Sequence, residues 1–144
     1  MPYLRIEYTA NLEAGADMAA LCRSLARLLV EQRDEAGRAI FPPGGTRVFA
    51  YPAGHYAVAD GERDYAFVYL NMRMLPGRSK AIIDMVGNAI FDHTKRHFAG
   101  IYADRLIGIL VQFDESTAQV YDGKHNNINA LFPEPLAPRG TAPG

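Results

Sequence analysis

The first half of the chain passes from a two-residue hydrophobic period to a helical one. Residues 2–8 place an apolar side chain at every second position, which predicts a strand with one face on a core. Residues 17–36 carry apolar side chains at helical spacing, and we expect that helix to end at Gly37. A Pro/Gly-rich turn follows, and residues 47–51 form a short strand candidate.

The second half repeats this order with stronger signals. Residues 65–74 alternate clearly and predict a strand, preceded by an Asp60-Gly61 turn that is typical of hairpins. A second helix is expected from about residue 79 to 97, with Ser79 as its N-cap. Residues 106–113 are apolar nearly throughout, as expected for a strand that is covered on both faces.

Together these elements predict an α/β (α+β) fold. Two β-α-β units would form one sheet, with both helices on the same face. The other face would carry Tyr65, Phe67 and Tyr69. Because large aromatic side chains are rarely left in water as a group, we expect another subunit to cover them.

Composition and charge indicate the class of protein but not a reaction that it would catalyse. The chain has 144 residues, 49% of them hydrophobic, and a net charge of −1, which suits one globular domain and argues against a strongly basic nucleic-acid binder. No apolar run is long enough to cross a bilayer, and the N-terminus lacks the features of a secretory signal. We therefore expect a cytoplasmic domain over residues 1–132, with an extended or disordered Pro/Gly-rich tail over residues 133–144.

Pro2 is the first candidate for chemistry. If Met1 is removed, Pro2 becomes a secondary amine at the start of a strand. A free α-amino group titrates near pH ~7.7–8.0, and burial or nearby cations lower that pKa further. Such a group suits proton transfer near neutral pH, although many chains begin with Met-Pro for no chemical reason.

Two arginines are candidates for anion binding. Arg78 lies where the second helix begins, so that an anion there would be held by both the guanidinium and the helix amides. Arg47 follows the Pro/Gly turn and opens a strand. Two arginines and an amine in one pocket would suit a substrate with several carboxylates, whereas the simpler interpretation makes both arginines surface charges.

The other reactive side chains give weaker signals. Cys22 lies on an apolar helical stripe and is expected in the core, without an internal disulfide. His93 and His97 share a helix face, but no metal-binding carboxylate accompanies them, and we expect exposed helix histidines. Asn126 and Asn127 are expected to be turn or packing amides.

Several motifs in combination resemble the tautomerase superfamily, and more closely the 5-carboxymethyl-2-hydroxymuconate Δ-isomerases. The resemblance covers about residues 2–132. Its motifs are Met1-Pro2, Ile40-Phe41-Pro42 with Arg47, Ala59-Asp60-Gly61, Asp64-Tyr65-Ala66-Phe67-Val68, Gly77-Arg78-Ser79, Lys124-His125-Asn126-Asn127 and Ala130-Leu131-Phe132.

The resemblance implies two strand-helix-strand units, a homotrimer with inward-facing sheets, and an active site near a subunit boundary. It places the catalytic base on Pro2 and substrate binding on Arg47 and Arg78, with a small carboxylate substrate and neither cofactor nor metal. A longer first-helix region, the tail and Pro52 depart from the expected family pattern.

The resulting hypothesis is a keto-enol isomerisation. Neutral Pro2 would take the 2-hydroxyl proton of 5-carboxymethyl-2-hydroxymuconate and return a proton to carbon five, giving 5-carboxy-2-oxohept-3-enedioate, a reaction of homoprotocatechuate catabolism. Two alternatives stay open: another keto-enol isomerase of the tautomerase superfamily, and a non-enzymatic small-ligand-binding domain.

Overall fold

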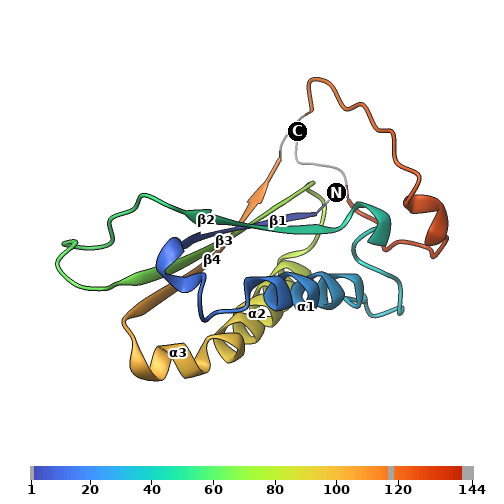
Figure 1. Cartoon of the computed structure of the whole chain (residues 1–144). Coiled ribbons are helices and arrows are strands. Elements are labelled where there is room, and N and C mark those ends of the chain that lie inside the picture. Colours follow the sequence, from blue (N-terminus) through green and yellow to red (C-terminus); the bar gives the residue numbers. More distant parts are fainter. Residues whose placement is uncertain (1, 117–118, 141–144) are drawn as a thin grey trace.

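A mixed four-stranded sheet organises the chain. The computed structural model describes residues 2–116 and 119–140, in which the sheet has the strand order β2-β1-β3-β4 (Figure 1). β1 runs parallel to β2 and antiparallel to β3, and β3 runs parallel to β4. The regular elements are β1 (Tyr3–Thr9), η1 (Ala10–Leu12), α1 (Met18–Val30), η2 (Pro43–Gly45), β2 (Arg47–Ala53), β3 (Ala66–Met74), α2 (Lys80–His97), α3 (Ala99–Asp104), β4 (Ile107–Glu115) and η3 (Asn129–Leu131).

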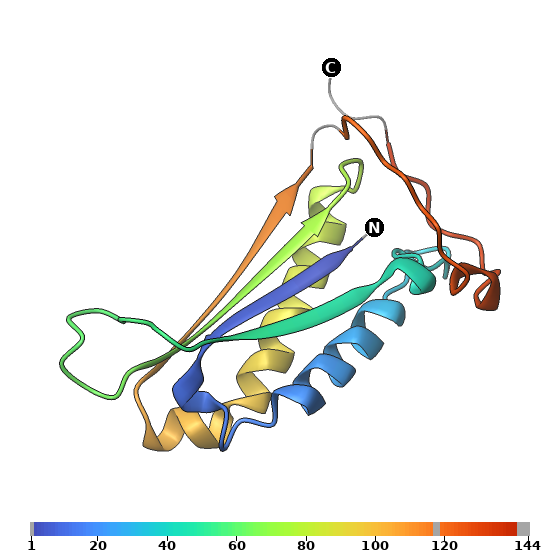
Figure 2. The same ribbon diagram turned by 45° about the horizontal axis from the view of Figure 1, so that its top comes forward.

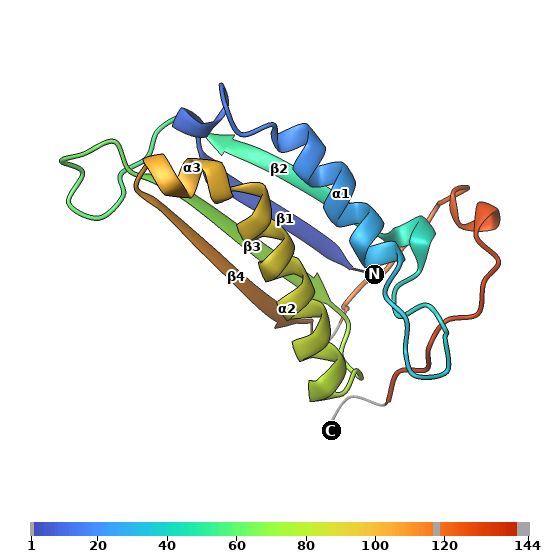
Figure 3. The same cartoon turned by 90° about the horizontal axis from the view of Figure 1, so that it is seen from below.

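Both long helices lie on one face of the sheet, as predicted (Figures 1 and 3). The alternation in the strands explains this arrangement, because Leu4 and Ile6 of β1 and Leu70 of β3 point toward the helices and are fully buried. They pack with the apolar stripes of α1 and α2, including Leu25 and Ile90. The two β-α-β units therefore share one core, and the predicted fold class is confirmed.

The first helix is shorter than predicted. α1 ends at Val30, and Gly37 instead closes a tight turn in which the Asp34 carboxylate accepts hydrogen bonds from the amides of Ala36 and Arg38. These bonds also lower the pKa of the Asp34 side chain. Residues 31–46 thus form a long connection to β2. Here an Asx turn supplies the hydrogen bonds to backbone groups that a longer helix would otherwise have supplied.

The second helix begins where the sequence predicts. The Ser79 hydroxyl accepts a hydrogen bond from the amide of Ile82 at 3.2 Å, so Ser79 is the N-cap of α2. The Asp60-Gly61 turn also exists, but the hairpin interpretation is wrong. β1 lies between β2 and β3, so the strands on either side of the turn are not neighbours. Pro52 is tolerated in β2 because this strand is at an edge of the sheet.

The sheet face turned away from the helices carries aromatic side chains, as predicted. Phe67 and Tyr69 of β3 lie there with Phe49 and Tyr51 of β2, which are 46% and 48% exposed. β4 is an edge strand and Leu110 is 40% exposed, so the prediction that this strand is covered on both faces is wrong for the single chain. The described segments leave this face open (Figure 1).

After β4 the chain forms a long arm that returns to the domain. Residues 119–140 extend away from the sheet, pass through η3 and turn back toward the connection between β3 and α2 (Figure 2). The Asn126 side chain accepts hydrogen bonds from the amides of Ile128 and Asn129 and donates one to the carbonyl of Gly44, as expected of a turn amide. Residues 133–140 form an extended segment, and the rest of the predicted tail, residues 141–144, lies outside the described residues.

Candidate active site

Pro2 lies at one end of the sheet, beside the start of β2 and the end of β3. It is buried and directly precedes β1. Tyr3, the next residue, is in register with Arg47 of β2 on one side and with Arg73 of β3 on the other. This end of the sheet therefore brings the start of the chain between two arginine-bearing strands. The predicted removal of Met1 concerns a residue outside the described ranges.

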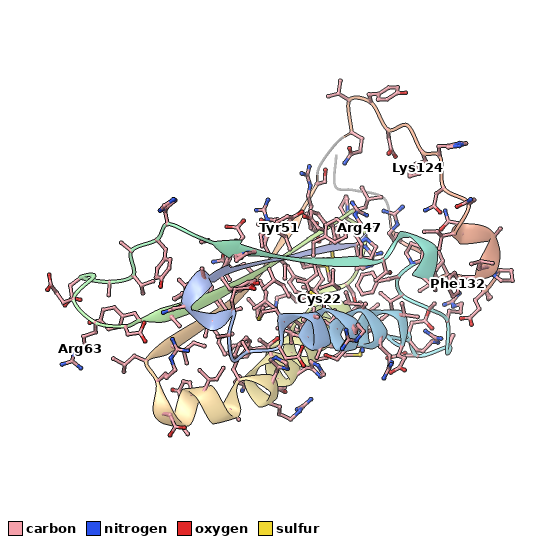
Figure 4. The ribbon with its side chains drawn as sticks, viewed as in Figure 1. Cys22, Arg47, Tyr51, Arg63, Lys124 and Phe132 are labelled. Atoms are coloured by element: carbon pink, nitrogen blue, oxygen red, sulfur yellow. The ribbon has the colours of Figure 1, made fainter. Side chains whose placement is uncertain are left out.

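A cavity of about 390 Å³ opens at this end of the sheet. Tyr3, Arg47, Arg73 and Lys124 contribute its aromatic and cationic lining, and Figure 4 shows Arg47 at the sheet end and Lys124 on the arm. The remaining lining residues are Met74, Leu75, Ser116, Gln119, Asp122 and Gly123. Of the cations, Lys124 is paired with the Asp122 carboxylate.

Arg47 presents its charge to this cavity. Its guanidinium donates a hydrogen bond to the carbonyl of Gly45 at 3.1 Å and stacks over the ring of Tyr3, 4.9 Å from the ring centre. Within residues 2–116 and 119–140, no carboxylate lies at ion-pair distance from it. Arg47 is thus oriented by neutral groups and keeps its charge available for an anion.

Arg78 is held more tightly. Its guanidinium donates hydrogen bonds to the carbonyls of Leu75 (2.9 Å) and Ile40 (3.3 Å) and stacks over the buried ring of Phe41. Burial, followed by the charge of Arg139, lowers the pKa of Arg78 to about 10, and Glu115 opposes this shift. The side chain is therefore half-buried and still protonated at neutral pH.

The predicted site residues lie in one region of the molecule, but they do not all line the same cavity. Pro2 and Arg47 lie at the same end of neighbouring strands, whereas Arg78 does not line the cavity and donates a hydrogen bond to the carbonyl of Leu75, which does line it. The sequence analysis missed Tyr3, Arg73 and Lys124 as lining residues. Arg73 had a signal, because it follows Tyr69 and Asn71 on the outward positions of β3.

His93 and His97 do not belong to this site, and the prediction that these two side chains are exposed is wrong, because both are half-buried. A ring nitrogen of His93 is hydrogen-bonded to the Ser24 hydroxyl of α1 at 2.7 Å, and His97 is hydrogen-bonded to the carbonyl of Ala16. Burial, then Arg96 and His97, lowers the pKa of His93. These contacts connect α2 to α1 and its N-terminal loop. Cys22 is half-buried against the core, which raises its pKa.

Neither a metal centre nor a membrane span emerges from the described parts of the chain. Residues 2–116 and 119–140 contain no group of three or more His, Cys, Asp or Glu side chains placed to hold a metal ion. In the same residues no helix combines the length and hydropathy needed to cross a bilayer.

The site carries groups suited to one kind of chemistry. An amine at Pro2 would exchange protons near neutral pH, and unpaired guanidinium groups bind carboxylates and stabilise oxyanions. The arrangement therefore fits proton transfer within a small acidic molecule.

Comparison with known proteins matches the chain to one family of enzymes. The family model of 5-carboxymethyl-2-hydroxymuconate isomerase matches residues 2–132. The 5-carboxymethyl-2-hydroxymuconate Delta-isomerase of Escherichia coli is 30% identical over 132 residues, covering 92% of this chain and 99% of the relative.

Solved structures extend the comparison to the fold. A crystal structure of a 5-carboxymethyl-2-hydroxymuconate delta-isomerase superposes with a TM-score of 0.86 and 43% identity, covering 95% of this chain and 96% of the other. The corresponding isomerase from Deinococcus radiodurans R1 gives a TM-score of 0.79 and 32% identity, covering 91% of this chain and 93% of the other. A fused 4-OT symmetric trimer shares the fold alone, at a TM-score of 0.55 and 15% identity over 89% of this chain and 98% of the other. The chain belongs to the 5-carboxymethyl-2-hydroxymuconate isomerase family and is an enzyme of the isomerase class.

Proposed function

We propose that this enzyme converts 5-carboxymethyl-2-hydroxymuconate to 5-carboxy-2-oxohept-3-enedioate with Pro2 as the proton carrier. The observation that carries the proposal is the position of Pro2, buried at the sheet end one residue before the register partner of Arg47. Membership of the isomerase family supports the substrate. The chemistry belongs to aromatic catabolism, and we place the enzyme in the cytoplasm.

The two steps together move one proton from oxygen to carbon and leave the substrate's composition unchanged. The neutral nitrogen of Pro2 takes the proton of the 2-hydroxyl group, the double bonds shift along the conjugated chain, and the proton goes to carbon five. Arg47 and Arg78 bind carboxylates and oppose the negative charge that develops on the 2-oxygen. The positive charge of Arg47 also disfavours protonation of a nearby amine.

We further propose that the enzyme is a homotrimer built on the open sheet face. Phe49 and Tyr51 are about half exposed there although both are large and apolar, and single chains rarely leave such a patch in water. The open face also holds the Arg5–Glu7 ion pair and the hydrogen bond from Asn71 to Asp114, so a neighbouring subunit would need complementary polar groups.

Light scattering should give a mass three times that of one chain. The variant Phe49→Arg should reduce the measured mass to that of one chain, and an unchanged mass would contradict this use of the face.

The catalytic proposal is tested on the intact protein by mass measurement and an ultraviolet assay for loss of the dienol. We expect Met1 to be absent and Pro2→Ala to lower turnover about 10²- to 10⁴-fold, with residual activity from its primary amine. Pro52→Ala is the matched control, because Pro52 is an exposed proline at the far end of β2, and it should keep full turnover. Full turnover by protein that retains Met1 would overturn the role of Pro2.

A further inference from the structure

The C-terminal segment contacts the domain on both sides of Arg78. The amide of Ala137 donates a hydrogen bond to the carbonyl of Ala39, and the amide of Gly140 donates one to the carbonyl of Gly77, both at 2.8 Å. The donors of both bonds lie beyond the 2–132 span of the family match, and the acceptors lie within it. Figure 2 shows this segment returning to the connection between β3 and α2.

These two contacts coincide with the groups that hold the Arg78 guanidinium. Ile40, next to Ala39, accepts one of its hydrogen bonds, and Leu75, close to Gly77, accepts the other. The C-terminal segment is therefore tied to the same two pieces of chain that orient Arg78.

Arg139 is brought close to Arg78 by this packing. Gly77 has a φ of +112°, and a Cβ atom added there would lie 2.3 Å from the carbonyl oxygen of Gly140 and 2.9 Å from Cβ of Arg139. The stem of Arg139 thus packs on the residue that precedes Arg78. The charge of Arg139 helps to lower the pKa of Arg78, after burial, which is the sign of two cations near one another.

Two neighbouring cations without a shared anion repel each other. Glu115 on β4 acts on Arg78 in the opposite direction, but no carboxylate in residues 2–116 and 119–140 lies at ion-pair distance from Arg78 or Arg139. A ligand carboxylate placed between them would relieve the repulsion and bind both guanidinium groups. Lys124 already has the Asp122 carboxylate as its partner.

We infer that Arg139 is a substrate-binding residue, which with Arg78 holds one carboxylate of a tricarboxylate. The inference rests on the proposed function, in which Arg47 binds one carboxylate of that substrate and Arg78 binds another. Arg139 adds a second guanidinium, from a segment outside the family match, to the carboxylate that Arg78 binds, which is that of the carboxymethyl group. It favours substrates with three carboxylates over those with two.

Kinetics on two substrates tests this role. Arg139→Ala should raise KM for the tricarboxylate dienol about tenfold with kcat within twofold. For 2-hydroxymuconate, which lacks the carboxymethyl group, KM should change less than twofold. Arg139→Lys should restore most of the difference because it keeps the charge.

The control is Arg33→Ala, which removes another exposed arginine and breaks the Arg33–Glu134 ion pair that also anchors the C-terminal segment. This variant should behave as the wild type. If it reproduces the effect of Arg139→Ala, or if Arg139→Ala raises KM equally for both substrates, Arg139 acts only by docking the segment and the inference is wrong. Truncation after Phe132 should raise KM as Arg139→Ala does, and increased activity would instead show that the segment obstructs the site.

Equilibrium binding separates this inference from the proposed reaction. Calorimetry with tricarballylate, a stable tricarboxylate, should show about tenfold weaker binding to Arg139→Ala, and glutarate should bind both proteins equally. This result is measurable even if the wild type does not turn over the dienol. Equal tricarballylate binding by the two proteins would overturn the role of Arg139.

Discussion

The two ends of the sheet are built from the same topology and differ in chemistry. At one end of the sheet, β1 and β2 begin and β3 and β4 end. At the other end, β3 and β4 begin and β1 and β2 end. The first end has Pro2 and a cavity lined by Arg47, and a further cavity near the second end is lined by Asp104 and Arg105. At the second end, Tyr65 precedes β3 as Pro2 precedes β1. The backbone nitrogen of Tyr65 belongs to a peptide bond within the chain.

The polar and charged groups at the second end are bound to one another. The side chain of Asn11 donates hydrogen bonds to the Asp64 carboxylate and to the carbonyl of Tyr65, at 2.9 and 2.8 Å. Arg105 is paired with the same carboxylate at 3.4 Å. The difference teaches that the duplicated fold does not make a site by itself. In the proposed function the site arises where a terminal Pro2 meets Arg47, which has no carboxylate partner within residues 2–116 and 119–140.

Removing the guanidinium groups of the first end should have the largest effect on substrate binding. Arg47→Ala and Arg78→Ala should each raise KM about 10- to 100-fold, because each loses a charged hydrogen bond of about 1.5–3 kcal/mol. Steady-state kinetics with the dienol measures this, and Arg23→Ala, an exposed arginine of α1, is the control. Wild-type KM in either site variant would remove that arginine from the site.

Raising the pH should weaken substrate binding at the first end by a smaller factor. The pKa of Arg78 is lowered to about 10, mainly by burial, so this side chain loses its proton as pH rises through that value. KM should be constant from pH 7 to 9 and rise severalfold above pH 10. Arg139→Ala should move this rise to higher pH because it removes a neighbouring cation. A profile that stays flat to pH 11 would contradict the lowered pKa.

Disrupting the second end should leave the reaction almost unchanged. Arg105→Ala breaks the pair with Asp64, whose side chain is 75% exposed, so we expect a loss of less than about 1 kcal/mol in the free energy of unfolding. Urea denaturation measures this loss, and kcat/KM should stay within twofold of the wild type. A large fall in kcat/KM would mean that the two ends of the sheet are coupled.

The sequence by itself determined the elements and the identity of the main candidates. Period-two alternation in β1 and β3 fixed which side chains face the helices, because a strand turns successive residues to opposite faces. Ser79 predicted the start of α2 through its capping hydroxyl. The motifs around Pro2, Arg47 and Arg78 indicated the family, and their roles in catalysis and binding stay predictions.

Only the tertiary structure decided how distant segments meet. It inserted β1 between β2 and β3, so that the Asp60-Gly61 turn joins strands that are not neighbours. The packing of the whole chain also brings Arg139 close to Arg78 and places His93 in hydrogen-bond contact with the Ser24 hydroxyl. Local periodicity reports which face of an element is buried, but strand order and contacts between remote side chains depend on how all the elements pack together.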